Sequence, residues 1–199
     1  MEKGKTREMG SRQVRAIPAE LRAKRNEGED PKIEGYFAVF NSNYQISNDM
    51  SESVAPGAFT KSLEENDIRA LVNHDTTLVL GRTKSGTLQL KEDDKGLFGA
   101  ISVNPNDRSA MDLYERVSRG DVDGCSFGFD IRSEETEIGA NGEVHWTMTD
   151  IDLAEVSCCT FPAYQSTNIE ARSEDAATIR KRETEAFKEK LKAKLKGAE

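Results

Sequence analysis

Hydrophobic and polar residues alternate along most of the middle of the chain, in short runs separated by glycine, proline and other turn residues. A two-residue period predicts β-strands, because successive side chains of a strand point to opposite faces of a sheet. The runs with this pattern lie at residues 16–24, 33–40, 68–72, 77–80, 87–90, 97–103, 124–131, 144–149 and 151–161. Many short strands of this kind predict an antiparallel sheet or barrel with helices packed outside it.

A helical period is clearest between Asp107, which is a suitable N-cap, and Gly120, which ends the pattern. Between them, apolar residues recur at i, i+3, i+4 and i+7, namely Ala110, Leu113, Tyr114 and Val117. A shorter helix is predicted over residues 58–65. The fold class is therefore α+β.

The two ends of the chain differ from the middle in their high content of charged residues. Residues 1–10 are predicted to be flexible, residues 11–172 to form the folded domain, and residues 173–199 to form a charged helical tail. The tail repeats apolar residues at steps of four, at Phe187, Leu191 and Leu195. Two interpretations of the tail are equally supported. It is either a solvated helix or a segment that docks on a partner or is removed by autocleavage.

Composition excludes several classes of function. The chain has 199 residues and a net charge of -8, which predicts no nucleic-acid partner. No apolar run approaches the length of about 20 residues needed to span a membrane, and residues 1–7 have no apolar signal core, so we expect neither a membrane partner nor secretion. The three cysteines, Cys125, Cys158 and Cys159, fit a reducing compartment better than a disulfide framework.

The same side-chain inventory predicts no metal and no cofactor. A zinc site needs four well-spaced ligands, and the chain has only two histidines, His74 and His145, to add to its cysteines. The cysteines are interpreted as small buried hydrophobic residues.

Candidate chemistry centres on residues 124–130. Alternation puts Cys125 and Phe127 on a core face and Ser126 on the opposite face, beside Gly128, whose missing side chain leaves room for a close approach. A small hydroxyl on a rigid strand suits a nucleophile. His74 follows a short apolar strand, and residues 150–163 offer carboxylates, so serine, histidine and carboxylate come from separate segments, as in a hydrolase triad.

Several short motifs resemble those of the prohead proteases of tailed phages, which mature the capsid. In chain order the matching pieces are Gly35–Phe40, Val54–Phe59, Leu71–Asp75, Leu80–Thr87, Gly96–Leu97, Arg119–Gly120, Gly124–Phe129, Leu153–Ser157 and Phe161–Tyr164. The resemblance implies a fold like that of herpesvirus assemblins, a mostly antiparallel β-barrel ringed by helices. It also implies a serine protease with Ser126 as nucleophile and His74 as base.

The third catalytic residue is less directly indicated. Glu155 is favoured, because a carboxylate between Ala154 and Val156 in an apolar strand needs a partner, and because its segment matches the family. The alternatives are Asp152, Asp150 and, on the herpesvirus pattern, His145. The candidates for oxyanion donors are backbone N–H groups near residues 126–128 and the side chains of Arg132 and Arg82, and the sequence does not decide among them.

The resemblance further implies the substrates and the setting. The implied substrates are the scaffold segment of the major capsid protein, other internal proteins of the procapsid and the protease itself. The last of these implies that the chain cleaves copies of itself and associates with them. The reaction takes place inside the assembling procapsid, in the cytoplasm of the bacterial host.

Three other interpretations stay open at this stage. The chain could be a non-enzymatic scaffold or core protein of the procapsid that retains the fold. A general esterase would need a G-x-S-x-G elbow, which the residues around Ser126 lack. A thiol protease would use Cys125, which alternation puts on the aromatic face, away from Ser126.

Overall fold

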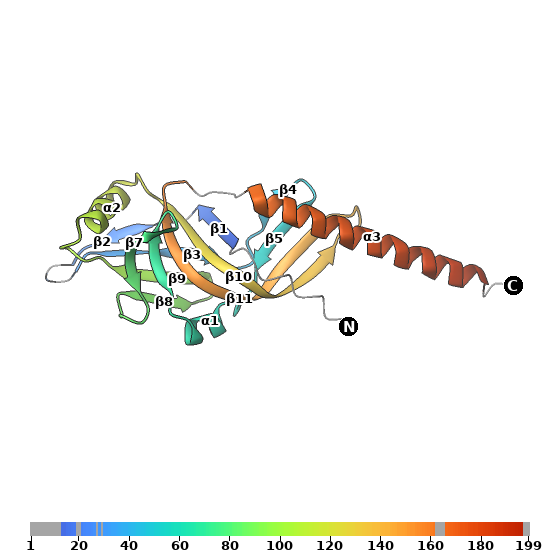
Figure 1. The fold of residues 1–199 in the computed structure, drawn as a ribbon, viewed down its shortest axis with the longest axis horizontal. Helices are drawn as coiled ribbons and strands as arrows, with labels where there is room; N and C mark the ends of the chain where they lie inside the picture. The colour runs from blue at the N-terminus through green and yellow to red at the C-terminus, as the bar shows by residue number, and fades with distance from the viewer. Residues whose placement is uncertain (1–12, 19–20, 27, 29, 162–165, 197–199) are drawn as a thin grey trace.

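Two β-sheets enclose the main hydrophobic core, and three helices lie around them (Figure 1). The structure is a computed structural model that describes residues 13–18, 21–26, 28, 30–161 and 166–196. The larger sheet has seven strands: β1 (Gln13–Pro18), β4 (Tyr44–Ser47), β5 (Met50–Val54), β6 (Arg69–Val72), β7 (Asp75–Arg82), β10 (Gly124–Ile138) and β11 (Val144–Cys159). The smaller sheet has four: β2 (Arg22–Lys24), β3 (Lys32–Val39), β8 (Leu88–Glu92) and β9 (Gly96–Ser102). The helices are α1 (Thr60–Glu65), α2 (Arg108–Arg119) and α3 (Ser166–Lys196).

The predicted α+β class with mostly antiparallel strands is confirmed, whereas the strands of the described residues form two sheets and no closed barrel. The physical reason lies in β11, which is 16 residues long and pairs with β10 along one side. On its other side it pairs in parallel with β5 near its start and with β6 near its end. The larger sheet therefore branches, and β1, β4 and β7 are left at its edges.

Strand β10 buries its aromatic face, as the alternation predicts. Cys125, Phe127 and Phe129 are at most 1% exposed, and the rings of Phe127 and Phe129 stack with centroids 4.8 Å apart. Each buried aromatic side chain contributes about 1.5–3 kcal/mol to folding. The opposite face of the strand is covered too, since Ser126 is also 0% exposed.

Helix α2 forms as its sequence predicts. The side chain of Asp107 accepts a hydrogen bond from Ala110 N at 3.1 Å, a cap worth about 1 kcal/mol. Gly120 ends the helix in a left-handed conformation with φ 81°. The predicted apolar stripe is buried against the sheets.

Helix α3 runs through the predicted boundary at residue 173 without a break. Its first turns are anchored, because Arg172 and Ala176 are 1% and 0% exposed, and Ala176 packs in a small core with Met50, Val144 and Trp146. The C-terminal part of the helix projects past the sheet (Figure 1), where residues 181–190 are all exposed and Phe187 is 67% exposed. The tail is therefore helical, while the domain boundary at residue 173 stays a prediction. The segment predicted to be flexible, residues 1–10, lies outside the described residues.

Candidate active site

His74 lies in the tight turn between β6 and β7. Asn73 and His74 both have positive φ, 50° and 61°, a conformation that costs about 1–2 kcal/mol for each non-glycine residue. The neighbouring strand β11 holds this turn, because Asn73 N donates to Cys158 O at 3.0 Å and His74 N donates to Ser157 Oγ at 3.2 Å. Backbone strain maintained by surrounding contacts is typical of functional positions.

The imidazole of His74 pairs with Glu155. His74 Nδ1 lies 2.7 Å from Glu155 Oε1, and Ser157 Oγ donates to the other oxygen, Oε2, at 2.6 Å. Gly128 makes room for this carboxylate, because a Cβ atom at residue 128 would lie 2.2 Å from Glu155 Oε1. The space that the missing side chain of Gly128 was predicted to leave beside Ser126 is therefore occupied by the Glu155 carboxylate.

Ser126 lies on the same face of the sheet as this pair but is not bonded to it. It is the cross-strand partner of Ser157, as Gly128 is of Glu155. Its Oγ donates to the backbone oxygen of Arg15 in β1 at 2.8 Å. The structure thus joins two of the three predicted residues by a hydrogen bond and puts the third on the adjacent strand, with its hydroxyl turned toward β1.

The second imidazole nitrogen meets a thiol. Cys159 Sγ lies 3.7 Å from His74 Nε2, and Cys159 is only 2% exposed. Burial lowers the pKa of His74, but the hydrogen bonds and charges of Cys159 and Glu155 outweigh burial and raise this pKa to about 9. In this arrangement His74 carries a proton at neutral pH.

The alternative third residues lie elsewhere. His145 bonds Ser51 Oγ at 2.8 Å and Ser53 Oγ at 2.9 Å. Ten positions of strand separate it from Glu155, which corresponds to roughly 33 Å. Asp152 accepts a hydrogen bond from Arg132 at 2.8 Å, and Asp150 lies 3.8 Å from the same guanidinium. None of these three has a recorded contact with His74 among the described residues.

The remaining candidates are also occupied or buried. Arg82 is bonded to Asp67 at 2.8 Å, and Arg132, a residue of β10 itself, is bonded to Asp152 at 2.8 Å, so both guanidinium groups are paired with carboxylates in this structure. Cys125 is 0% exposed, and burial raises the pKa of its thiol well above the usual value, which makes a thiolate nucleophile there unfavourable.

Sequence reasoning missed three participants: Ser157, Cys159 and the carbonyl of Arg15. Strand parity could have found the first two, because residues 155, 157 and 159 of β11 share one face. The Arg15 carbonyl has no signal in the sequence, since any residue supplies the same oxygen.

Within the described ranges, no group of three or more histidine, cysteine or acidic residues is arranged to hold a metal ion. The helices of the described residues include none that is long and apolar enough to span a membrane.

Two comparisons relate the chain to known proteins. The model of the caudovirus prohead serine protease family matches residues 18–182. The prohead protease of Enterobacteria phage HK97 is 31% identical over 148 residues, which cover 73% of this chain and 61% of that protein. The chain thus spans about three fifths of the length of this relative. No solved structure matches the chain.

Proposed function

Because the chain belongs to the caudovirus prohead serine protease family, we propose that it is a serine endopeptidase with Ser126 as nucleophile, His74 as base and Glu155 as the third catalytic residue. The observation that carries the proposal is the hydrogen bond from His74 Nδ1 to Glu155, on the sheet face that Ser126 shares. A carboxylate at Nδ1 fixes the imidazole in one tautomer and leaves Nε2 for proton transfer.

In the proposed reaction, Ser126 Oγ attacks the carbonyl carbon of the substrate while its proton passes to His74 Nε2. His74 then gives this proton to the leaving amine, and the peptide C–N bond breaks to leave an acyl-enzyme. A water molecule attacks the ester as His74 takes a proton from it, and the acid product leaves as Ser126 regains its hydrogen. Glu155 stabilises the imidazolium in both halves of the reaction.

The arrangement described here corresponds to a resting site in this proposal. The Ser126 hydroxyl donates to Arg15 O, and His74 Nε2 faces Cys159. For catalysis, the Ser126 side chain must rotate about χ1, so that its hydroxyl leaves Arg15 O and approaches the imidazole of His74. His74 Nε2 must then form a hydrogen bond with this hydroxyl in place of its contact with the Cys159 thiol. A neutral His74 is required for proton transfer, so release from Cys159 also lowers the pKa of the base.

We propose that the chain acts in the assembling prohead, in the cytoplasm of the bacterial host, and the name of the HK97 relative, a prohead protease, supports the first part of this setting. We propose that the substrates are the scaffold segment of the major capsid protein and the chain itself. The exposed part of α3 is proposed to dock on capsid or scaffold protein, with the protease domain over residues 11–172 and the tail over 173–199. A relationship with the herpesvirus protease fold is part of the same proposal.

The test compares intact masses of the wild-type chain and Ser126→Ala, each expressed alone and with the capsid protein. The expected result is trimming of wild-type chain and capsid protein, and full-length products with the variant. Ser53→Ala, which removes a buried serine from the same sheet away from His74, serves as the matched control and should be trimmed like the wild type. If both wild type and Ser126→Ala stay intact while procapsids still assemble, the non-enzymatic assembly role replaces this proposal.

A further inference from the structure

Charge is divided unevenly between the end of α3, residues 181–196, which we call the arm, and the rest of the chain. The arm contains seven lysine and arginine residues and three glutamates, so it carries a net charge of +4, whereas the whole chain carries -8. The remaining residues therefore carry -12. A basic segment on an acidic protein attracts acidic partners that the rest of the surface repels.

The arm is the continuation of a helix whose first turns are held by the sheet. Arg172 is 1% exposed, and Nε of Arg180 donates to Gly142 O at 2.9 Å. Residues 181–190 are then all exposed, and the helix runs on past the sheet (Figure 1). Because its direction and its helical conformation are already fixed, the arm loses less entropy on binding than a disordered tail would.

A narrow apolar seam runs along the arm. Phe187 is 67% exposed, and Leu191 and Leu195 follow it at steps of four residues. With 3.6 residues per turn, two positions border each side of this seam. These four positions are all lysines: Lys188 and Lys192 on one side, and Lys190 and Lys194 on the other. A seam one residue wide between charges of one sign is typical of helices that pair with a helix of opposite charge.

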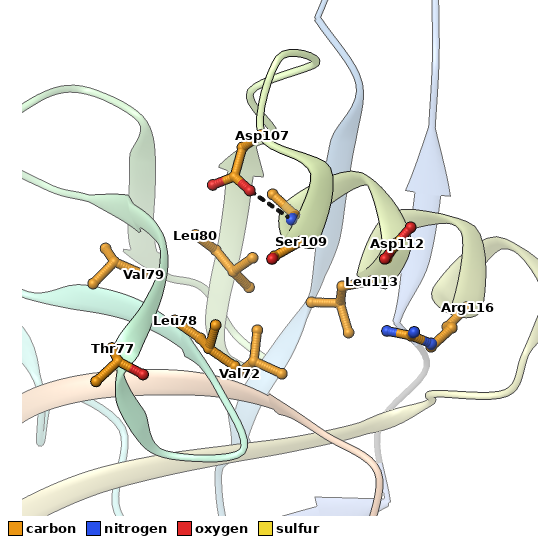
Figure 2. A pocket seen from close by; sticks show the side chains of 11 residues that line it. Val72, Thr77, Leu78, Val79, Leu80, Asp107, Ser109, Asp112, Leu113 and Arg116 are labelled. Carbon is orange, nitrogen blue, oxygen red and sulfur yellow. Dashed lines mark hydrogen bonds between the residues drawn. The ribbon is translucent and has the colours of Figure 1, made fainter.

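The other exposed apolar residues lack this combination. The described part of the chain has four exposed large hydrophobic residues: Leu78, Val79, Phe161 and Phe187. Leu78 and Val79 line a cavity of about 440 Å³, but the helix α2 on its other side carries both Asp112 and Arg116 (Figure 2). No charged residue lies within four positions of Phe161 in the sequence. Of the four, Phe187 alone is bordered by an excess of one charge.

We propose that the arm binds an acidic amphipathic helix of a partner protein. The apolar residues of this helix pack on the seam, and its carboxylates pair with the bordering lysines. The inference rests on the proposed docking of α3 on capsid or scaffold protein, and it names the chemistry of the segment that is bound. In pairing of this kind the charges select the partner, and the buried seam contributes to the affinity.

Other occupants fit the arm less well. A nucleic acid would use the lysines but leave the seam in water, and the three glutamates of the arm would lie close to its phosphates. A membrane surface needs a broad apolar face, whereas the apolar face of this helix is one residue wide. The arm of a second copy would bring lysines against lysines.

The test measures binding of the full chain to two synthetic helical peptides that have leucine at the a and d positions of each heptad. One peptide has glutamate at positions e and g, and the other has lysine there. Wild type and Ser126→Ala are both used, because the proposed self-cleavage cannot remove the arm of the variant. The glutamate peptide should bind at least about tenfold more tightly than the lysine peptide, and added salt should weaken its binding.

Charge reversal on the arm tests the role of the lysines. The double variant Lys188→Glu/Lys190→Glu reverses one charge on each side of the seam, so its affinity for the glutamate peptide should fall at least about tenfold. Lys61→Glu/Lys84→Glu is the matched control, because it reverses two exposed lysines outside the arm. Its affinity should stay within about twofold of the wild type.

Truncation of an aromatic ring tests the role of the seam. Phe187→Ala should weaken binding of the glutamate peptide about threefold to tenfold, because it removes apolar surface from the contact. Phe161→Ala, which removes the same ring from an exposed position outside the arm, should bind like the wild type.

Failure to bind the glutamate peptide, equal binding of both peptides, or full affinity in Lys188→Glu/Lys190→Glu would overturn this inference. Tighter binding to a double-stranded oligonucleotide or to phosphatidylglycerol vesicles would overturn it too, as would self-association that the double variant abolishes. These outcomes leave the protease function intact. That function fails separately, if the wild type trims itself and the capsid protein no more than Ser126→Ala does.

Discussion

Two buried glutamates of the larger sheet, Glu52 and Glu155, have opposite kinds of partner. Glu52 is 0% exposed and is bound by two guanidinium groups, those of Arg15 and Arg172, with distances of 2.9 Å and 3.3 Å to its Oε2. Glu155 is 6% exposed and is bound by an imidazole and a hydroxyl, those of His74 and Ser157. Both carboxylates are compensated, but only one of them has a partner, the imidazole of His74, that can take up and release a proton.

The difference separates a structural carboxylate from a reactive one. The ionic cluster of Arg15, Glu52, Glu134 and Arg172 ties β1, β5, β10 and α3 together with permanent charges. The His74 site, made of His74, Glu155, Ser157 and Cys159, holds a group that can change its charge, and the His74 side chain is 26% exposed. Arg15 belongs to both regions, because its guanidinium binds Glu52 while its carbonyl holds the Ser126 hydroxyl.

The largest effect is expected for Glu155→Gln. The amide keeps the shape of the side chain but cannot hold the same tautomer of His74 or stabilise its imidazolium, so kcat should fall by about 10⁴-fold. The melting temperature at neutral pH should fall modestly, because Glu155 is one of the contacts that stabilise protonated His74. Steady-state kinetics with a cleaved peptide and thermal unfolding measure the two quantities, and a variant with near wild-type kcat would remove Glu155 from the catalytic residues.

Glu52→Gln should show the reverse behaviour. It leaves two buried guanidinium groups without their shared anion, and removal of one partner of a buried ion pair costs about 3–5 kcal/mol. Urea unfolding should record this loss, while the folded fraction retains its activity within a few fold.

Glu137→Gln is the matched control for this prediction, because Glu137 is an exposed residue of β10, and its free energy of unfolding should change by less than about 0.5 kcal/mol. If Glu52→Gln lost activity and kept its stability, the division between the two regions would be wrong.

Periodicity within single elements carried most of what the sequence could predict. The two-residue period identified the core face of β10 and the position of Glu155 within an apolar strand, and the helical period with its caps identified α2, because each depends on neighbours within one element. The hydrogen bond to His74 agrees with the choice of Glu155 over Asp152, while its catalytic role stays a prediction.

The features that could not be predicted depend on contacts between distant segments. The branched pairing of β11 with β5 and β6 is a matter of tertiary register, which alternation in a single strand does not specify. The bond from Ser126 to Arg15 joins residues 111 positions apart through a backbone oxygen. The contact of Cys159 with His74 depends on the left-handed turn at residues 73–74, a conformation that no residue type there requires.

Ser157→Ala should have an intermediate effect that distinguishes positioning from binding. It removes the hydroxyl that donates to Glu155 Oε2 and that accepts a hydrogen bond from the backbone N–H of His74. Each buried group left without a partner costs about 1–3 kcal/mol. We expect kcat to fall about tenfold to hundredfold, with KM within about threefold of the wild type. Ser53→Ala should leave both constants unchanged, and a change confined to KM would assign Ser157 to substrate binding instead.

The smallest effect is expected for Cys159→Ala, and it concerns the pH at which the enzyme works. With a pKa of about 9, His74 is protonated at neutral pH, so the wild-type rate should rise with pH up to about 9. Without the thiol this pKa loses one of the contacts that raise it, and the rising limb should move to lower pH. Cys125→Ala, which alters a core cysteine on the other face of the sheet, should keep the wild-type profile.

The same contact predicts the sign of a stability change. The pKa of His74 in the folded protein, about 9, exceeds its ordinary value of 6.5, so the folded state binds the proton more tightly than the unfolded chain. The resulting stabilisation is complete below pH 6.5 and is lost as pH rises through about 9. The difference in unfolding free energy between wild type and Cys159→Ala should therefore shrink between pH 6 and pH 9.5 in urea titrations. A difference that stays constant over this range would mean that Cys159 stabilises the fold by packing alone and leaves the proton of His74 unaffected.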